Sequence, residues 1–144
     1  FLVRFGWAKP VMVNPSNFRQ PKRDDILVSV AGPAMNLLLG FIAFYIILFI
    51  RTHNVDVSSI TYGIIQMIFV YNVNFAIFNM LPIPPLDGSH IFLSGLNLSN
   101  EVERKITQYG TLTLFAVIII ENIIDIDLLP IGTFTHWVVS LVFR

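Results

Sequence analysis

The sequence contains no cysteine and carries little charge. Without cysteine the chain can form neither a disulfide nor a cysteine-ligated metal site. Charged residues make up 12% of its 144 residues, against about 25% in a typical soluble domain. Nine basic residues balance nine acidic ones and no basic tract is present, so we expect no nucleic-acid partner. Hydrophobic residues reach 55%, which indicates that a lipid bilayer surrounds the chain, and the length suggests one domain, 1–144.

Uncharged runs of membrane-spanning length are the main feature of the pattern. Residues 26–50 and 60–81 hold no charged residue, and at about 1.5 Å per residue each run covers a hydrocarbon core of about 30 Å. A third span is predicted over 106–129, although Glu121 interrupts it. Residues 131–143 are apolar but short, which favours a partial or interfacial helix. The sequence therefore predicts an all-α membrane protein with three to four transmembrane helices.

The first part of the chain, residues 1–25, differs in kind. Gly6, Pro10 and Pro15 punctuate short β-prone pieces, a pattern typical of extended strands joined by turns. The polar run "RQPKRDD" that follows is expected to be a hinge before the first span. We expect a short membrane-associated segment that resembles a β-hairpin.

Basic residues are unevenly distributed between the predicted loops. The segment before the first span carries five of them: Arg4, Lys9, Arg19, Lys22 and Arg23. The next loop has only Arg51, and the loop after the second span has Arg104 and Lys105. The positive-inside rule then predicts a multi-pass protein of the cell (inner) membrane, with the chain's N-terminal side and the side of residues 82–110 in the cytoplasm.

A proline cluster ends the second span in the stretch "NMLPIPPLDGSHIF", residues 79–92. Pro82, Pro84 and Pro85 cannot continue a helix without losing amide donors and clashing with preceding carbonyls. Two interpretations of Asp87 follow. In one, the helix simply stops and Asp87 lies in a surface turn. In the other, the chain dips back toward a polar pocket in which the carboxylate acts as a ligand or proton carrier.

Polar side chains inside the two spans are candidates for such a pocket. Ser29 and Asn36 lie in the first span, and Asn72 and Asn79 lie seven residues apart, on one face of the second. These four side chains could line a shared polar crevice. The alternative is plain hydrogen bonding between helices, worth under about 1–2 kcal/mol for each pair.

Three sequence blocks carry a family resemblance. "AGPAMN" in the first span and "NMLPIPPLDG" after the second resemble the site-2 protease family of intramembrane zinc metallopeptidases. "FGWAKPVMVNPSNF" is similar to the segment that precedes them in the short bacterial type without a PDZ domain. The resemblance extends from about residue 3 to Ile124, and its specificity comes from the three blocks occurring in this order.

The resemblance implies a zinc peptidase whose metal is held by two histidines of an HExxH helix and the aspartate of the LDG motif. It assigns Asp87 as the third zinc ligand and Asn79 as the amide that steadies the substrate carbonyl. Zn²⁺ is the implied cofactor, with a bound water as nucleophile. The implied reaction is hydrolysis of peptide bonds within or near the transmembrane segments of membrane proteins.

Substrate binding is expected to involve the N-terminal segment. A protease cleaves an extended peptide, and an edge strand could hold the unwound substrate by β-augmentation. Within "AKPVMV" the candidate substrate-binding residues are Pro10, Val11 and Val13, joined by Asn36 of the first span. The alternative role of this segment is a structural hairpin at the membrane interface.

The sequence departs from the family because it contains no HExxH. Its histidines are His53, His90 and His136, and none is paired at i, i+4 or followed by Glu. In the family the HExxH helix precedes the "GWAKPV" segment, so we expect this chain to be a C-terminal part that cannot assemble the zinc site alone. A metal pair formed by Asp87 and His90 is a minor alternative. A transporter or channel fragment with a Pro-broken helix, or an inactive membrane scaffold, remain alternative functions.

Overall fold

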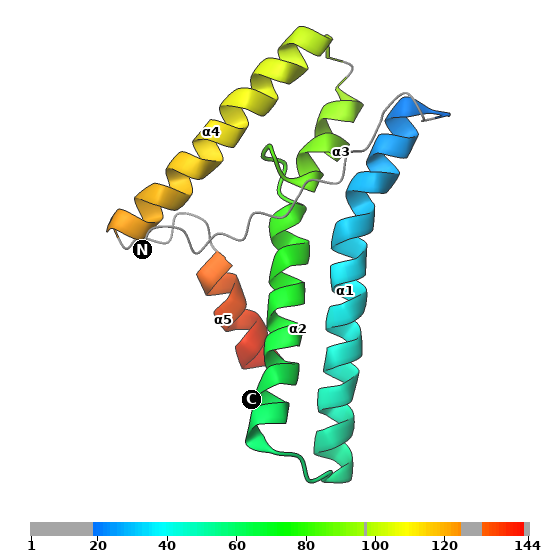
Figure 1. The fold of residues 1–144 in the computed structure, drawn as a ribbon, viewed down its shortest axis with the longest axis vertical. Coiled ribbons are helices and arrows are strands. Elements are labelled where there is room, and N and C mark those ends of the chain that lie inside the picture. The colour runs from blue at the N-terminus through cyan, green and yellow to red at the C-terminus, as the bar shows by residue number, and fades with distance from the viewer. Residues whose placement is uncertain (1–18, 97, 125–130, 143–144) are drawn as a thin grey trace.

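The computed structural model describes residues 19–96, 98–124 and 131–142, and every regular element in these ranges is a helix. The predicted all-α class is confirmed for this part of the chain, while residues 1–18 of the predicted β-hairpin-like segment lie outside it. The helices, shown in Figure 1, are α1 (Pro21–His53), α2 (Ser59–Asn79), α3 (Asp87–Gly95), α4 (Asn100–Ile124) and α5 (Ile131–Val142).

Helix α1 is longer than the predicted span because it includes the polar segment before it. The hinge expected up to residue 25 is wrong from Pro21 onward, since proline fits the first helical position, where its missing amide would have no partner. The helix continues without a break through the buried Pro33. It ends where Asn54 adopts the left-handed conformation, with φ 48° and ψ 43°, and donates its backbone N–H to the Ile50 carbonyl.

Helix α2 begins and ends close to the predicted boundaries. The Ser58 hydroxyl caps its first turn by accepting a hydrogen bond of 3.1 Å from the Thr61 amide. At the other end the Met80 amide donates to the Ala76 carbonyl at 3.2 Å, and the helix stops at Asn79, before the prolines. The predicted proline break is therefore confirmed.

Helices α1 and α2 run antiparallel, side by side (Figure 1). Gly40 of α1 permits this close approach, because a Cβ there would lie 3.1 Å from a methyl group of Val73. Buried apolar side chains from α1, α2 and α5 form the core at this level: Ala43, Ile47, Phe69 and Val138.

Two of the described helices, α1 and α2, are long and apolar enough to cross a membrane. Only 22% of the most apolar stretch of α1 and 11% of that of α2 are buried within the chain, so their large hydrophobic side chains face outward, unlike those of a core helix in a soluble protein. The predicted count of three to four spans is not confirmed among the described residues. Helix α5 has 12 residues, too few to cross. Helix α4 includes residues 106–124 of the predicted third span, and residues 125–129 of that span lie outside the described part of the chain.

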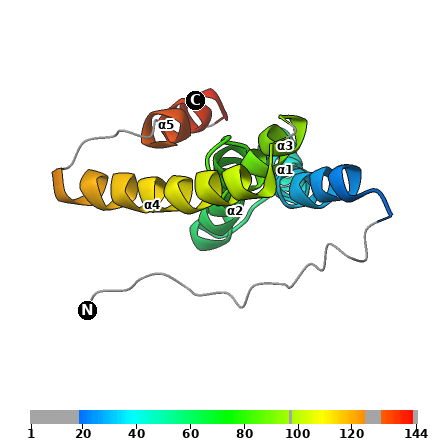
Figure 2. The same cartoon turned by 90° about the horizontal axis from the view of Figure 1, so that it is seen from above.

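Two shorter helices pack on this pair. Helix α3 packs on α1, and α5 packs on α2. The C-terminal carbonyl of α5, that of Val142, accepts a hydrogen bond of 3.0 Å from Arg51 of α1. Figure 2 shows α4 extending sideways from the α1–α2 pair, and its Gly110 approaches Pro84 in the connection between α2 and α3.

Candidate functional site

A tight turn closed by backbone contacts joins α2 to α3. The Leu86 amide donates to the Ile83 carbonyl at 3.0 Å, and the Ser89 amide donates to the Leu86 carbonyl at 3.0 Å. A Cβ on Gly88 would clash with the Met80 carbonyl and would lie 2.7 Å from the Leu81 carbonyl oxygen. Only glycine fits here, so Gly88 allows α3 to start directly against the end of α2.

Asp87 is the first residue of α3, and Gly88 after it is buried. The interpretation of this pair as a surface turn is therefore wrong. The Asp87 side chain points at α1, where a Cβ placed on Gly32 would lie 3.2 Å from Asp87 Oδ2. The two blocks "AGP" and "LDG" thus meet in space, and the missing side chain of Gly32 makes room for the carboxylate.

Partial burial gives the Asp87 carboxylate an unusual electrostatic environment. Loss of hydration raises the pKa of Asp87 above its usual value, and the positive charge of protonated His90 lowers it in part. A cation bound beside Asp87 would offset the unfavourable dehydration of the carboxylate.

A second polar contact joins α3 to α1 near the start of α1. Asp25 Oδ2 accepts a hydrogen bond of 3.3 Å from the Ser94 hydroxyl and lies 3.4 Å from His90 Nδ1. The sequence pattern singled out neither Asp25 nor Ser94. Their spacing from the motif residues was the available signal. Asp25 lies seven residues before Gly32 and Ser94 lies seven residues after Asp87, so each shares a helix face with a motif residue.

The predicted polar crevice is only partly supported. Ser29 is buried, and Asn36 and Asn79 are half-buried, but Asn72 Nδ2 donates to the Ile68 carbonyl of its own helix at 2.8 Å. Asn79 is the last residue of α2, next to the Met80 carbonyl against which Gly88 packs. The turn between α2 and α3 therefore places Asn79 and Asp87 at the same end of α2. The structure does not test their predicted roles.

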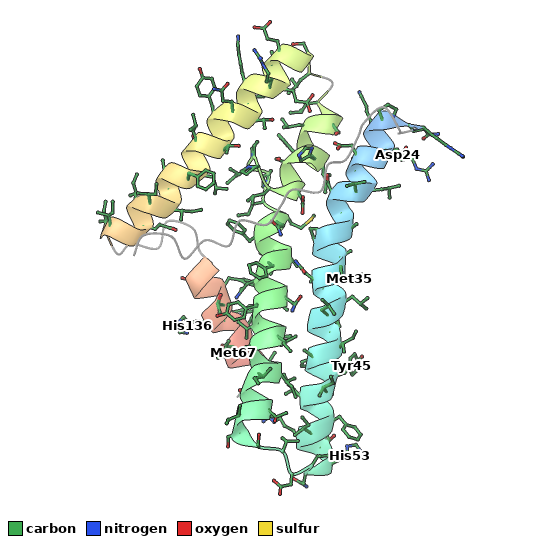
Figure 3. All side chains as sticks on the ribbon, viewed as in Figure 1. Asp24, Met35, Tyr45, His53, Met67 and His136 are labelled. Carbon is green, nitrogen blue, oxygen red and sulfur yellow. The ribbon has the colours of Figure 1, made fainter. Side chains whose placement is uncertain are left out.

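The predicted strand residues Pro10, Val11 and Val13 lie outside the described part of the chain. The histidines are dispersed: Figure 3 places His53 at the C-terminal end of α1 and His136 on α5, whereas His90 lies on α3.

Within the described residues, no group of three or more His, Asp or Glu side chains could hold a metal ion. The donors in the described ranges therefore do not complete a zinc site. Asp87 can contribute one carboxylate, which is the single ligand that the resemblance assigned to this part of the family's active site.

Comparisons with known proteins support the resemblance. Residues 51–120 match the model of Peptidase family M50. The chain is 33% identical over 140 residues to "Putative zinc metalloprotease YwhC" of Bacillus subtilis, covering 92% of this chain and 59% of that protein. It is 38% identical over 64 residues to "Putative zinc metalloprotease MJ0611" of Methanocaldococcus jannaschii, covering 44% of this chain and 31% of that protein. No solved structure matches.

Both relatives are named as zinc metalloproteases, and the family match together with the apolar helices indicates a membrane protein. The matched segment belongs to peptidase family M50, the site-2 protease family, so the predicted resemblance is confirmed. The chain spans 59% of the length of the Bacillus subtilis relative.

Proposed function

We propose that this chain forms part of the active site of an intramembrane zinc metalloprotease, which hydrolyses peptide bonds within or near transmembrane segments of other membrane proteins. The observation that carries the proposal is the contact between Asp87 and Gly32, which puts a partly buried carboxylate at the junction of α1, α2 and α3. Membership of family M50 and the zinc metalloprotease names of both relatives support it.

In this proposal Asp87 supplies one zinc ligand, and the histidine ligands come from sequence outside these 144 residues. When bound, zinc supplies a Lewis acid and lowers the pKa of its water. Gly32 and Gly88 hold the carboxylate in place, the first by leaving room for it and the second by letting α3 start against α2. Asn79, at the end of α2, is the proposed amide donor to the substrate carbonyl.

The proposed substrate is a membrane protein that approaches through the bilayer. Asn36 and the strand residues Pro10, Val11 and Val13 are its proposed contacts, with the strand residues holding the unwound peptide by β-augmentation. The basic residues before α1 and in its first turn, together with Arg104 and Lys105 of α4, support an orientation in the cell membrane with Asp87 toward the cytoplasm.

The test is made on the full-length protein, purified in detergent. Zinc content and cleavage of a transmembrane-segment substrate are measured for the wild type, Asp87→Asn and Asp87→Ala. We expect about one zinc per wild-type chain and loss of both zinc and cleavage in the two variants. Asp56→Asn is the matched control, since Asp56 is an exposed acid in the loop between α1 and α2, and it is expected to behave like the wild type.

Retention of zinc and cleavage in Asp87→Ala would contradict the proposal. A companion measurement uses the 144-residue chain alone. Because this sequence contains no HExxH, the chain alone is expected to bind zinc below one-to-one stoichiometry and to cleave no peptide. Stoichiometric zinc together with cleavage by the chain alone would show that the ligands were assigned to the wrong residues.

A further inference from the structure

We propose that Asp25 is a positioning residue for Asp87: through α3, it sets the rotation and register with which the Asp87 carboxylate is presented. The inference rests on the function proposed for Asp87. Asp25 itself lies near the start of α1 and touches α3 at the end opposite Asp87.

The Asp25 carboxylate contacts two side chains of α3, those of Ser94 and His90. Asp25 Oδ2 accepts a hydrogen bond of 3.3 Å from Ser94 Oγ and lies 3.4 Å from His90 Nδ1. The Asp25 side chain is 36% exposed, so water only partly competes for this carboxylate. Since a hydrogen bond to a charged acceptor is stronger than a neutral one, the contact can resist rotation of a short helix.

Helices α1 and α3 contact each other at two points, and these points have the same spacing along both helices. Asp25 and Gly32 are seven residues apart on α1, and Asp87 and Ser94 are seven residues apart on α3. Seven residues make nearly two helical turns, about 10 Å, so each pair lies on one face of its helix. Asp25 meets Ser94 while Gly32 meets Asp87, which means that the two helices run antiparallel and are held at both ends of the shared face.

Helix α3 needs this second anchor because it is short. It has nine residues, and isolated helices of this length are unstable in water. Its first turn is fixed where Gly88 packs on the carbonyls of Met80 and Leu81. Without the Asp25 contact, α3 would lose the polar interaction that fixes its rotation against α1, and a small rotation would move the Asp87 carboxylate away from Gly32.

The kinetic test compares three variants of the full-length protein. Asp25→Ala removes the acceptor and is expected to lower kcat and zinc affinity by roughly 10- to 100-fold, the usual effect of losing a group that orients a metal ligand, with KM unchanged. Asp25→Asn keeps an acceptor oxygen for Ser94 but loses the charge, so its kcat and zinc affinity are expected to lie between those of Asp25→Ala and the wild type. Asp24→Ala is the matched control, because the neighbouring Asp24, labelled in Figure 3, accepts instead from the backbone amide of Gln20 at 3.1 Å.

A cysteine pair tests the geometry even if Asp25→Ala folds poorly. The chain contains no cysteine, so Asp25→Cys combined with Ser94→Cys introduces one defined pair. We expect this pair to form a disulfide on mild oxidation, to recover cleavage when oxidised and to lose it when reduced. Asp24→Cys with Ser94→Cys is the control and is expected to cross-link poorly.

The outcomes separate the two proposals. If cleavage depends on Asp87 but Asp25→Ala keeps the wild-type kcat, or if the oxidised cysteine pair does not restore cleavage, Asp25 is not a positioning residue and the proposed function stands. If Asp87→Ala keeps zinc and cleavage, the proposed function is wrong, and the positioning role falls with it.

Discussion

Gly110 of α4 lies against Pro84, in the turn that leads to Asp87, so closely that a Cβ on residue 110 would be 2.8 Å from Pro84 Cδ and 3.0 Å from Cγ. Pro84 is buried and its ring is rigid. The approach of α4 to the turn between α2 and α3 therefore depends on a glycine at this position.

Replacing this glycine should loosen α4 from the rest of the molecule. We expect Gly110→Ala to destabilise the protein by about 1–3 kcal/mol, the usual range for overpacking, measured by thermal unfolding in detergent. Gly63→Ala in α2 is the control. A Cβ there meets no atom within 4 Å, so alanine is expected to stabilise α2 by up to about 1 kcal/mol. Equal effects of the two substitutions would show that the contact with Pro84 is unimportant.

The start of α3 should be still less tolerant. In Gly88→Ala the new methyl group meets the carbonyls of Met80 and Leu81, which are backbone groups and cannot rotate away. We expect α3 to separate from the end of α2, with a loss of at least about 3 kcal/mol, the upper part of the usual overpacking range. Faster amide hydrogen exchange from Asp87 to Gly95 would report this separation.

Gly95→Ala is the matched control for Gly88→Ala, since a Cβ on Gly95 meets nothing within 4 Å. It is expected to leave hydrogen exchange in α3 unchanged. Unchanged exchange in Gly88→Ala as well would mean that the turn can adapt to a side chain.

Gly32 offers a way to change the metal site without unfolding the protein. In Gly32→Ala the Cβ lies 3.2 Å from Asp87 Oδ2, so the carboxylate must shift by a few tenths of an ångström, while alanine favours the helix by up to about 1 kcal/mol. We expect thermal stability within about 1 kcal/mol of the wild type and weaker zinc binding by the full-length protein. Zinc binding equal to that of the wild type would show that the carboxylate adapts freely.

The cap of α2 gives a prediction that is independent of the proposed function. Ser58→Ala removes the hydroxyl that accepts from the Thr61 amide, and we expect a loss of about 1 kcal/mol in the free energy of unfolding. Ser59→Ala, one residue further on, is the control and is expected to have little effect, because residue 59 is already inside the helix. The measurement is thermal unfolding of both variants in the same detergent.

The sequence predicted the two membrane-length helices well because lipid imposes a simple requirement, a long run without charge. Residues 26–50 lie inside α1, and residues 60–81 overlap nearly all of α2. The polar residues before the first run were misread as a hinge. Charge excludes a segment from hydrocarbon but not from a helix, and Pro21 fits the first helical turn.

The candidate site was predictable only in part. The proline break singled out Asp87 independently of the resemblance, and Gly32 belongs to the "AGPAMN" block; the structure brings the two residues together. The contact of Asp25 with Ser94 joins residues 69 positions apart, and no local pattern specifies such a pairing. It depends on how α3 lies against α1, a tertiary arrangement that short-range sequence does not encode.

Helix α1 connects two anchors at a fixed separation. Near its start Asp25 holds α3, and near its end Arg51 holds the last carbonyl of α5. Inserting or deleting one residue between them would rotate one anchor about 100° relative to the other and move it about 1.5 Å along the axis. This helix can therefore accept many changes of side chain on its lipid face but no change of length, so insertions and deletions in this protein belong in its loops.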